Sequence, residues 1–358
     1  MKVLHVLYTN KLSGAENVAG DICMMVDENF EMAYCSLNGP IAAALADRGI
    51  RFLPLASFTY RELKKVIHSF SPDVIHAHDV RATVLVSLVA GPIPFISHLH
   101  VNNGDMNRPS RKAFLYKWAV RKAAKVIAVS DSCFADYVYN QDIKNKTDIL
   151  KNIIYPNRLN TLAAYDTNDY TFDFIFVGRL TDQKDPERMA KVASEVLKAV
   201  PSSQFGVIGE GDMRKAMESV FEQEKVRHQV TFTGRLAYPY KAMQSSSCLL
   251  MCSKFEGTPI AALEAMAFKL PIVSTPVDGM QDLVTHEETG FLYADDANLS
   301  RAVVRLVTSE DLRNEMGEKS YHLYTKLNDH EQYKMQIEQL YREVADQSSL
   351  IRRAEVPS

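Results

Sequence analysis

The sequence predicts an α/β fold in which a parallel sheet flanked by helices occurs twice along the chain. The chain has 358 residues, and at roughly 150 residues per domain this length suggests about two domains. Short apolar runs alternate with helical patterns from end to end. The runs are continuous rather than alternating, which is typical of strands covered by helices on both faces. Such an order of elements indicates two doubly wound domains.

The first seven apolar runs are expected to form the sheet of the N-terminal domain. In chain order they read KVLHVLY, EMAYCSL, RFLPL, DVIHAH, PFISHL, KVIAVS and DILKNII. Six further runs are expected in the second sheet, and they read FDFIFVG, SQFGVIG, VTFTG, CLLMCS, PIVST and GFLY. The helical patterns between consecutive runs supply the crossover connections that parallel strands need.

A polar, turn-rich stretch over residues 155–170, YPNRLNTLAAYDTNDY, separates the two sets of strands and is the expected linker. We therefore expect an N-terminal domain over residues 1–160 and a second domain over residues 161–330. Residues 331–358 predict a final amphipathic helix that packs back on the N-terminal domain, with a frayed tail after Ala345. Its apolar positions at helical spacing are Tyr333, Ile337, Leu340, Tyr341 and Val344.

Composition and charge exclude several classes of protein. With 46% hydrophobic and 24% charged residues, the chain is neither disordered nor fibrous. The formal net charge of -3 gives no general attraction to nucleic acid. The N-terminus MKVLHVLYTN runs directly into a strand pattern and no run of 18 apolar residues follows, so we expect neither a signal peptide nor a membrane span. The five cysteines are scattered and odd in number, which suits a reducing cytoplasm.

Ligands of doubly wound folds bind beyond the carboxyl ends of the strands, so the loops after strands are the candidate sites. After the first strand, TNKLSGAENVAG places Gly14 at the start of a helix whose free amide groups suit an anion. The loop lacks G-x-G-x-x-G spacing, which disfavours a nicotinamide site. An ordinary strand-to-helix turn explains the same residues.

A second loop, in FVGRLTDQKDPERMAKVA, holds two cations close together. Asp185 reads as the N-cap of a helix and Pro186 as its first residue. Arg179 can bind phosphate oxygens as a fork and Lys184 adds a mobile point charge, a pair suited to a diphosphate. Two solvated surface charges are the alternative interpretation.

Three glycines end consecutive strands in VIGEGD and TFTGRL. They are Gly209, Gly211 and Gly234, and Arg235 follows the last of them. Glycines at these positions leave room for the flat ring of a ligand against the backbone, and plain turns explain them as well.

The stretch KFEGTPIAALEAMAF predicts an apolar helix with one carboxylate inside it. Thr258 is expected to cap this helix and Pro259 to occupy its first position, so that the amide groups around Gly257 point outward toward a phosphate. Glu264 lies more than a turn further along, where an unpaired carboxylate would cost several kcal/mol to bury. We expect paired ribose hydroxyls to satisfy it, with Glu256 reaching beyond the phosphates.

These motifs, taken in order, resemble the retaining glycosyltransferases of family 4. The resemblance rests on KVLHVL, SGAE, PDVIHAH, FVGRL with QKDP, GEG, FTG, EGTPIAALEAMA, PIVST and TGFL, and on the Glu256-x7-Glu264 spacing. It implies the GT-B fold, in which two Rossmann-like doubly wound domains face each other across a cleft. It also implies transfer of a sugar from a nucleotide diphosphate donor with retained anomeric configuration and without a metal.

The resemblance assigns roles to individual residues. Arg179 and Lys184 neutralise the departing diphosphate, Glu264 binds the ribose, Glu256 holds hydroxyls of the donor sugar, and His100 lies beside the reacting sugar. The donor-binding set is completed by Gly14, Gly209, Gly211, Gly234, Arg235, Gly257 and Thr258. Two departures stand out: Ser13 replaces the first glycine of the family's usual pair, and IIYPNRLN replaces a pattern close to IPNGID.

Two H-x-H pairs, His76 with His78 and His98 with His100, allow a metal interpretation because alternate residues of a strand share a face. Asp79 could add an oxygen ligand. We favour no metal, because the pairs end neighbouring strands beside the expected cleft and the resemblance already accounts for His100.

Residues 108–125, RPSRKAFLYKWAVRKAAK, carry cations and no acid. Phe114, Leu115 and Trp118 group on one helical face. This pattern fits an amphipathic element on an anionic membrane. It equally fits an apolar face packed on the N-terminal sheet, with solvated cations. The candidate membrane or acceptor residues are Arg108, Arg111, Lys112, Lys117, Trp118 and Arg121.

The sequence therefore predicts a cytoplasmic glycosyltransferase, peripheral on the inner face of the membrane, that uses a nucleotide sugar, preferably a UDP-sugar. The expected acceptor is a glycan or a lipid-linked sugar of surface polysaccharide synthesis, with no nucleic-acid partner and no cofactor. A nucleotide-sugar 2-epimerase and a non-catalytic nucleotide-sugar-binding subunit are the alternatives.

Overall fold

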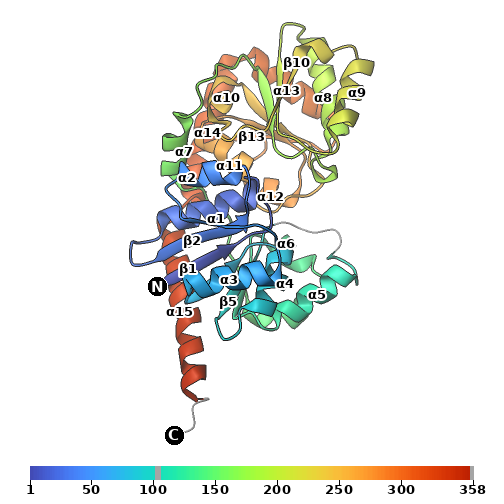
Figure 1. The fold of residues 1–358 in the computed structure, drawn as a ribbon. Coiled ribbons are helices and arrows are strands. Elements are labelled where there is room, and N and C mark those ends of the chain that lie inside the picture. Colours follow the sequence, from blue (N-terminus) through green and yellow to red (C-terminus); the bar gives the residue numbers. More distant parts are fainter. Residues whose placement is uncertain (101–105, 355–358) are drawn as a thin grey trace. The chain divides into compact units, whose positions relative to one another are not determined.

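The computed structural model describes residues 1–100 and 106–354 and divides into two compact units. Unit 1 contains Met1–Tyr155 together with the C-terminal segment from His330, and unit 2 contains Pro156–Asp329. Each unit holds one parallel sheet with helices on its faces (Figure 1). The fold class predicted from the sequence is confirmed.

Unit 1 has a seven-stranded parallel sheet in the order β3-β2-β1-β4-β5-β6-β7. The chain order reverses between β1 and β4, which is the topological switch point where doubly wound sheets place their ligands. All seven predicted runs form strands. Their bounds are β1 Lys2–Val6, β2 Glu31–Leu37, β3 Phe52–Leu55, β4 Val74–Ala77, β5 Phe95–Leu99, β6 Lys125–Ala128 and β7 Thr147–Ile149.

The helices of unit 1 follow the strands as crossover connections and bury one apolar face each. Their bounds are α1 Gly14–Met25, α2 Ile41–Ala46, α3 Tyr60–Phe70, α4 Val80–Val89, α5 Arg111–Val120, α6 Asp131–Ala135 and α15 His330–Ala354. Short 3-10 turns, η1 Asn140–Asp142 and η2 Lys144–Lys146, precede β7.

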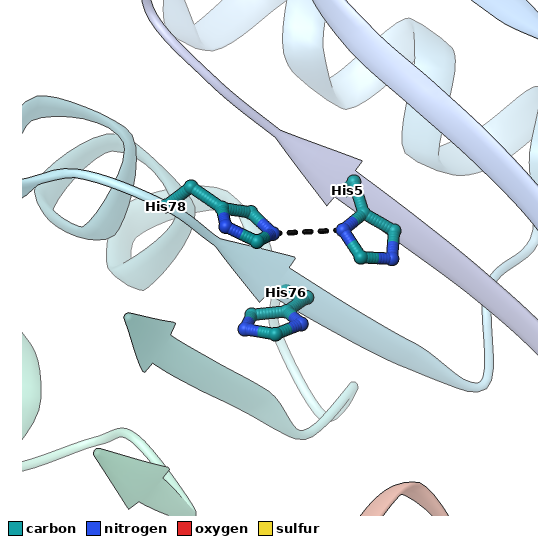
Figure 2. Close-up of side chains that lie close together, drawn as sticks. All are labelled: His5, His76 and His78. Atoms are coloured by element: carbon teal, nitrogen blue, oxygen red, sulfur yellow. Dashed lines mark hydrogen bonds between the residues drawn. The ribbon is translucent and has the colours of Figure 1, made fainter. Parts of the chain in front are cut away.

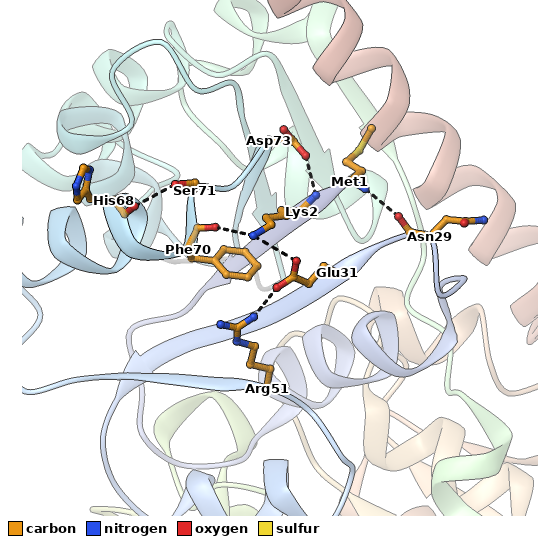
Figure 3. A network of polar contacts seen from close by, with 9 residues as sticks. All are labelled: Met1, Lys2, Asn29, Glu31, Arg51, His68, Phe70, Ser71 and Asp73. Carbon is orange, nitrogen blue, oxygen red and sulfur yellow. Dashed lines mark hydrogen bonds and ion pairs between the residues drawn. The ribbon is translucent and has the colours of Figure 1, made fainter.

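The amino ends of strands β1 to β4 are joined by charged and polar contacts (Figure 3). The Lys2 amide donates to Asp73 Oδ2 at 2.7 Å, and the Lys2 ammonium lies 3.3 Å from Glu31 Oε2. Glu31 also pairs with Arg51. These contacts tie the strands together at the edge opposite the loops that follow the strands, so they are structural.

Helix α15 packs against α1 and β4 of unit 1 (Figure 1). Tyr341 and Ile337 are fully buried in this contact. Glu338 Oε1 accepts a hydrogen bond of 3.0 Å from the Asp27 amide. The helix runs to Ala354, beyond Ala345 where we expected fraying.

Unit 2 has a six-stranded parallel sheet in the order β10-β9-β8-β11-β12-β13, and all six predicted runs form strands. Stacked phenylalanines fill much of its core, with Phe174 and Phe205 at a ring-centroid distance of 4.6 Å. The strand bounds are β8 Phe174–Val177, β9 Phe205–Ile208, β10 Val230–Gly234, β11 Cys248–Met251, β12 Ile272–Ser274 and β13 Gly290–Leu292.

The helices of unit 2 cover both faces of its sheet. They are α7 Pro156–Ala163, α8 Pro186–Ala199, α9 Arg214–Gln223, α10 Tyr240–Ser245, α11 Ile260–Ala267, α12 Asp278–Gln281, α13 Asp296–Thr308 and α14 Glu310–Leu327, with 3-10 turns η3 Asp182–Lys184 and η4 Arg227–Gln229. Within the described part of the chain, no helix has the length and apolarity that crossing a bilayer requires.

The boundary between the two units falls between Tyr155 and Pro156, at the start of the predicted linker over residues 155–170. The stretch is not turn throughout, because α7 forms at its start. Leu159 and Leu162 of this helix are buried, and so is the whole side chain of Arg158. Burial of these side chains in unit 2 stabilises a helix that the polar composition of the stretch does not predict.

Candidate functional site

The loops that follow β8 and β11 bring a lysine and a carboxylate together. The two strands are neighbours in the sheet of unit 2, so their carboxyl ends meet at the same edge. Lys184, at the end of η3, forms an ion pair with Glu256, which lies in the loop after β11. Glu256 is buried and also accepts a hydrogen bond of 2.6 Å from Ser253 Oγ. The carboxylate is therefore held in place by the protein itself.

Arg179 lies on the same loop as Lys184 and its side chain is exposed. The loop then turns through Asp185, whose φ of 50° is in the left-handed region. Asp185 is the N-cap of α8, as predicted, but its side chain makes no capping hydrogen bond. Pro186 begins the helix as predicted.

Helix α11 begins one residue later than the sequence suggested. Pro259 is its N-cap and Ile260 its first residue, so the predicted cap by Thr258 is wrong. The Gly257 loop is instead held by α12, where a Cβ on Gly279 would lie 1.6 Å from the Gly257 carbonyl oxygen. Close packing of two backbone segments, rather than a side-chain cap, shapes the approach to this helix.

Glu264 lies inside α11 and is buried, as predicted, but it has a partner within the chain. Arg158 Nη1 of α7 donates to Glu264 Oε1 at 2.8 Å, and the two side chains are 0% and 5% exposed. The same guanidinium nitrogen donates to the buried hydroxyl of Tyr240 on α10 at 2.5 Å. We expected ribose hydroxyls to satisfy Glu264, and the structure shows that Arg158 already compensates its charge within the chain.

The strand-end glycines leave less open space than we expected. A Cβ on Gly209 would lie 1.8 Å from the Gly178 carbonyl oxygen, and a Cβ on Gly211 would lie 2.1 Å from that of Leu180. Neighbouring loops thus fill these positions. Gly234 has more room, because a Cβ there would lie 3.3 Å from Glu210 Oε1, an atom of a flexible side chain. Its φ of 71° is one that residues other than glycine rarely adopt. Arg235 follows it with a half-buried side chain.

In unit 1, α1 starts at Gly14 as the sequence indicated, and Gly14 is exposed. Ser13 Oγ donates to the Glu16 carboxylate in the first turn. A carboxylate so near the helix start interacts favourably with the helix dipole.

Five buried histidines line one face of the unit 1 sheet near the switch point. His5 lies on β1 opposite His76 of β4, and His78, His98 and His100 follow along β4 and β5. Their rings lie close together, with centroids 4.0 Å apart for His98 and His100 and 4.1 Å apart for His76 and His78. Figure 2 shows three of them, with the hydrogen bond between His5 and His78.

Hydrogen bonds connect four of these histidines. His78 Nε2 is 2.7 Å from His5 Nδ1, and His78 Nδ1 is 2.9 Å from His100 Nε2. The hydroxyl of Tyr341, from α15, lies 2.8 Å from His76 Nδ1 and 3.3 Å from His5 Nε2. Neither ring nitrogen of His98 has a hydrogen-bond partner among the described residues.

Burial keeps these imidazoles neutral. It lowers the pKa of His5 to about 3 and that of His100 to about 3, while a polar contact with Asn152 acts in the opposite direction on His100. Burial also lowers the pKa of His76, His78 and His98 well below the ordinary value. A neutral imidazole is both a hydrogen-bond donor and an acceptor.

Neutral imidazoles can also hold a metal ion. His5, His76 and His78 form one group whose ligand atoms lie within 4.8 Å of one another, and His78, His98 and His100 form a second. Asp79 does not join them, because its carboxylate caps α4 through the Ala82 amide at 2.7 Å and accepts from the Tyr8 amide at 3.0 Å.

On α5, the apolar residues that we identified face solvent rather than the sheet. Phe114 is 61% exposed, Leu115 50% and Trp118 38%. The buried face of α5 is formed by Ala113, Tyr116, Ala119 and Val120. The interpretation that the Phe114 group packs on the sheet is therefore wrong.

The cations of the same segment differ in their surroundings. Arg108, Arg111 and Arg121 are exposed and Lys112 is half-buried. Lys117 instead pairs with Asp142 at 2.8 Å and is only 20% exposed. Exposed apolar residues and exposed arginines therefore occur together in this segment of unit 1.

Sequence reasoning missed Arg158, His5 and Tyr341. Arg158 stands where the related motif carries a glycine, and this departure was the available signal. His5 lies in an apolar strand and Tyr341 on the buried stripe of α15. Nothing local marks either residue as a hydrogen-bond partner of the H-x-H pairs.

The models of two known families together match most of the chain. Residues 160–323 match the model of glycosyl transferases group 1, and residues 22–158 match the model of glycosyltransferase family 4. An uncharacterized glycosyltransferase of Methanocaldococcus jannaschii is 28% identical over 311 residues, covering 84% of this chain and 82% of the relative.

An Escherichia coli relative is the UDP-Gal:alpha-D-GlcNAc-diphosphoundecaprenol alpha-1,3-galactosyltransferase, 25% identical over 359 residues that cover 88% of this chain and 90% of the relative. Among solved structures, Anabaena HepE in complex with UDP and glucose has a TM-score of 0.82 at 17% identity, covering 96% of this chain and 100% of HepE. HepE has also been solved with UDP-glucose, with a TM-score of 0.81 and the same identity and coverage. These structures share the fold.

Proposed function

Because this chain belongs to the family 4 glycosyltransferases, which use nucleotide-sugar donors, we propose that it transfers a sugar from a UDP-sugar with retention of the anomeric configuration. The choice of UDP is supported by the Escherichia coli relative, whose name specifies UDP-galactose, and by HepE, which was solved with UDP-glucose. The GT-B architecture agrees with this activity.

The observation that carries the proposal is the charged group at the carboxyl ends of β8 and β11. Arg179 and Lys184 supply positive charge, and the Lys184–Glu256 pair is already assembled at the edge of the sheet. As the anomeric bond breaks, negative charge grows on the departing phosphate, and preorganised cations stabilise it. Lys184 then turns from Glu256 to the diphosphate, and Glu256 accepts hydroxyls of the donor sugar.

The remaining donor contacts follow from α11 and the strand-end loops. The Gly257–Thr258 amides at the start of α11 take the phosphates. Arg158 uses one oxygen of Glu264, and the other oxygen of this carboxylate accepts the ribose hydroxyls. Arg158 is then a positioning residue that holds the carboxylate in place. Gly14, Gly209, Gly211, Gly234 and Arg235 complete the proposed set.

The reaction needs no protein nucleophile in this proposal. The acceptor hydroxyl attacks from the face that the diphosphate leaves, and a phosphate oxygen takes its proton. His100 lies beside the reacting sugar, where its neutral ring forms a hydrogen bond with a sugar hydroxyl. Arg179 and Lys184 carry out the charge neutralisation that other transferases assign to a metal ion.

The acceptor is proposed to be a lipid-linked glycan at a membrane surface. The relative from Escherichia coli acts on a diphosphoundecaprenol-linked sugar according to its name. The exposed group of Phe114, Leu115 and Trp118 can enter the boundary between lipid head groups and chains, while Arg111 and Arg121 contact anionic lipids. Lys117 contributes little, since Asp142 already neutralises it.

The activity is tested by release of UDP from a panel of UDP- and GDP-sugars, with Lys184→Met beside the wild type. We expect the variant to lose about a hundredfold to a thousandfold in kcat. Lys191→Met is the matched control, because Lys191 is an exposed lysine of α8 within two turns of Lys184. Equal losses in both variants, or an epimerised sugar as the product, would contradict the proposal.

Membrane association is tested by sedimentation with vesicles of increasing phosphatidylglycerol content. Each cation near an anionic surface contributes about 1 kcal/mol, so Arg111→Glu with Arg121→Glu, which removes two cations, should reduce binding by about thirtyfold or more. Binding that is independent of anionic lipid would exclude this part of the proposal.

A further inference from the structure

Three of the buried histidines of unit 1 bring their ring nitrogens close enough together to hold one ion. His5 on β1 lies opposite His76 on β4. His78 directly follows β4 and continues its line, because its amide donates to the Val6 carbonyl at 3.1 Å. The candidate ligand nitrogens of the three rings lie within 4.8 Å of one another (Figure 2). An H-x-H pair on one strand and a third histidine on its neighbour therefore share one face of the sheet.

Several nitrogens of the histidine cluster are buried without a use in the protein. His76 Nε2 and both ring nitrogens of His98 have no hydrogen-bond partner among the described residues. The ring centroid of His98 lies 5.3 Å from those of His76 and His78. Buried polar atoms without a partner destabilise a fold, and each one in a native structure calls for an explanation. A bound metal ion would use the lone pairs that otherwise have no partner.

We propose that His5, His76 and His78 bind one divalent transition-metal ion, with His98 as the fourth ligand. Imidazole suits Zn²⁺, Cu²⁺ and Ni²⁺, whereas Mg²⁺ and Ca²⁺ prefer oxygen ligands. Zn²⁺ is the ion to test first, since it binds histidine in tetrahedral sites. Zinc–nitrogen bonds of about 2.0 to 2.1 Å place neighbouring ligand nitrogens roughly 3.3 Å apart, so binding requires side-chain shifts of about an ångström.

The outer hydrogen bonds of the three rings fit this arrangement. The ion would take His5 Nδ1 and His78 Nε2, which face each other at 2.7 Å, together with His76 Nε2. The hydroxyl of Tyr341 lies 3.3 Å from His5 Nε2 and 2.8 Å from His76 Nδ1, and His100 Nε2 lies 2.9 Å from His78 Nδ1. Metal-binding histidines ordinarily donate their second nitrogen to such a partner. The tyrosine oxygen has two lone pairs and can accept from both rings.

The protonation state of the rings also suits a metal, which binds an unprotonated nitrogen. Burial lowers the pKa of His5 to about 3, and it lowers the pKa of His76 and His78 well below the ordinary value. The three rings are therefore neutral at pH 7. Acid strong enough to protonate them would also release the ion, so falling pH destabilises the metal-bound and the metal-free protein alike.

The ion would have a structural role in unit 1. It would join β1 to β4, the two strands on either side of the switch point. Tyr341 would extend this link to α15, the segment that returns to unit 1 after unit 2. The donor chemistry proposed for Arg179 and Lys184 needs no such ion, so the two proposals fail independently of each other.

The test is the metal content of the full chain, expressed in zinc-supplemented medium and passed over a size-exclusion column. We expect one zinc ion per chain by mass spectrometry, and a shell of nitrogen at about 2.0 to 2.1 Å in the zinc X-ray absorption spectrum. After removal of zinc by a chelator, Zn²⁺ should raise the melting temperature, and Mg²⁺ or Ca²⁺ should not. A wild type that retains no zinc, or a zinc ion bound mainly by oxygen, would overturn the proposal.

Two variants separate the site from zinc binding at the surface. His76→Gln should lose the stoichiometric zinc, whereas His68→Gln, at an exposed position of α3, should retain it. Tyr341→Phe keeps the ligands and should weaken zinc affinity about tenfold to a hundredfold. Equal zinc loss in the two histidine variants would refute the site, and unchanged affinity in folded Tyr341→Phe would refute the role of Tyr341. If His76→Gln does not fold, the wild-type metal content and absorption spectrum still decide.

Discussion

Replacing Arg158 by methionine removes the cation from a buried ion pair in unit 2 and leaves its partner in place. Arg158 Nη1 lies 2.8 Å from Glu264 Oε1, and the two side chains are 0% and 5% exposed. Arg158→Met keeps most of the volume and the apolar stem of the side chain. The carboxylate of Glu264 would then lie in an apolar helix without its compensating charge.

The magnitude follows from the geometry. Two unit charges 2.8 Å apart attract by roughly 6 kcal/mol at an effective dielectric constant of about 20. The variant no longer has a guanidinium to desolvate on folding, so the net loss of stability is smaller than this attraction. Removal of one partner from a buried pair destabilises proteins by about 3 to 5 kcal/mol. We expect a loss of this size in the free energy of unfolding of unit 2.

The assay is urea unfolding followed by two signals. Trp118 is the only tryptophan in the sequence and belongs to unit 1, so its emission reports that unit. Far-UV circular dichroism reports both units. We expect the circular-dichroism transition of Arg158→Met to move to lower urea while the tryptophan transition stays in place.

Two comparisons make the result decisive. Arg188→Met removes an exposed pair with Asp296, at 2.7 Å and with side chains 28% and 47% exposed, and should cost less than about 1 kcal/mol. The double variant Arg158→Met with Glu264→Leu removes both charges and should recover most of the lost stability. The reasoning is refuted if Arg158→Met costs no more than Arg188→Met, or if the double variant is less stable than the single one.

Four further predictions concern the site, two loops and the response to acid. Glu264→Gln keeps the shape of the side chain but removes its charge, so affinity for UDP in calorimetry should fall about tenfold or more as one charge-assisted hydrogen bond is lost. Gly279→Ala places a methyl group 1.6 Å from the Gly257 carbonyl oxygen and should lower both the melting temperature and UDP affinity. Gly49→Ala meets nothing within 4 Å at a φ of 67°, so it should cost only the backbone strain of about 1 to 2 kcal/mol. Burial lowers the pKa of His5 to about 3. Its unfolded form binds a proton near pH 6.5 and the folded form does not, so the stability of unit 1, followed by Trp118 emission, should fall between pH 7 and 5 by about 2 kcal/mol for each such histidine. A flat profile over this range would contradict their burial as neutral rings.

The sequence by itself determined the strands, because each is a continuous apolar run whose burial is a local property of the chain. All thirteen predicted runs became strands, seven in one sheet and six in the other. The burial of Glu264 was also predictable, since an apolar helix surrounds it. The helix boundaries were less predictable: we expected Thr258 to cap α11, and the structure has Pro259 as its N-cap.

Only the tertiary structure decided the partners of the buried polar groups. Arg158 reaches Glu264 across 106 residues of sequence, and Tyr341 reaches His76 across 265. The tertiary structure also explains why position 209 is a glycine, because the Gly178 carbonyl of a neighbouring loop occupies the space of a side chain there. The sequence reveals that a buried charge or donor needs a hydrogen-bond partner. Which group becomes that partner depends on how distant elements pack, and no local pattern in the sequence contains that information.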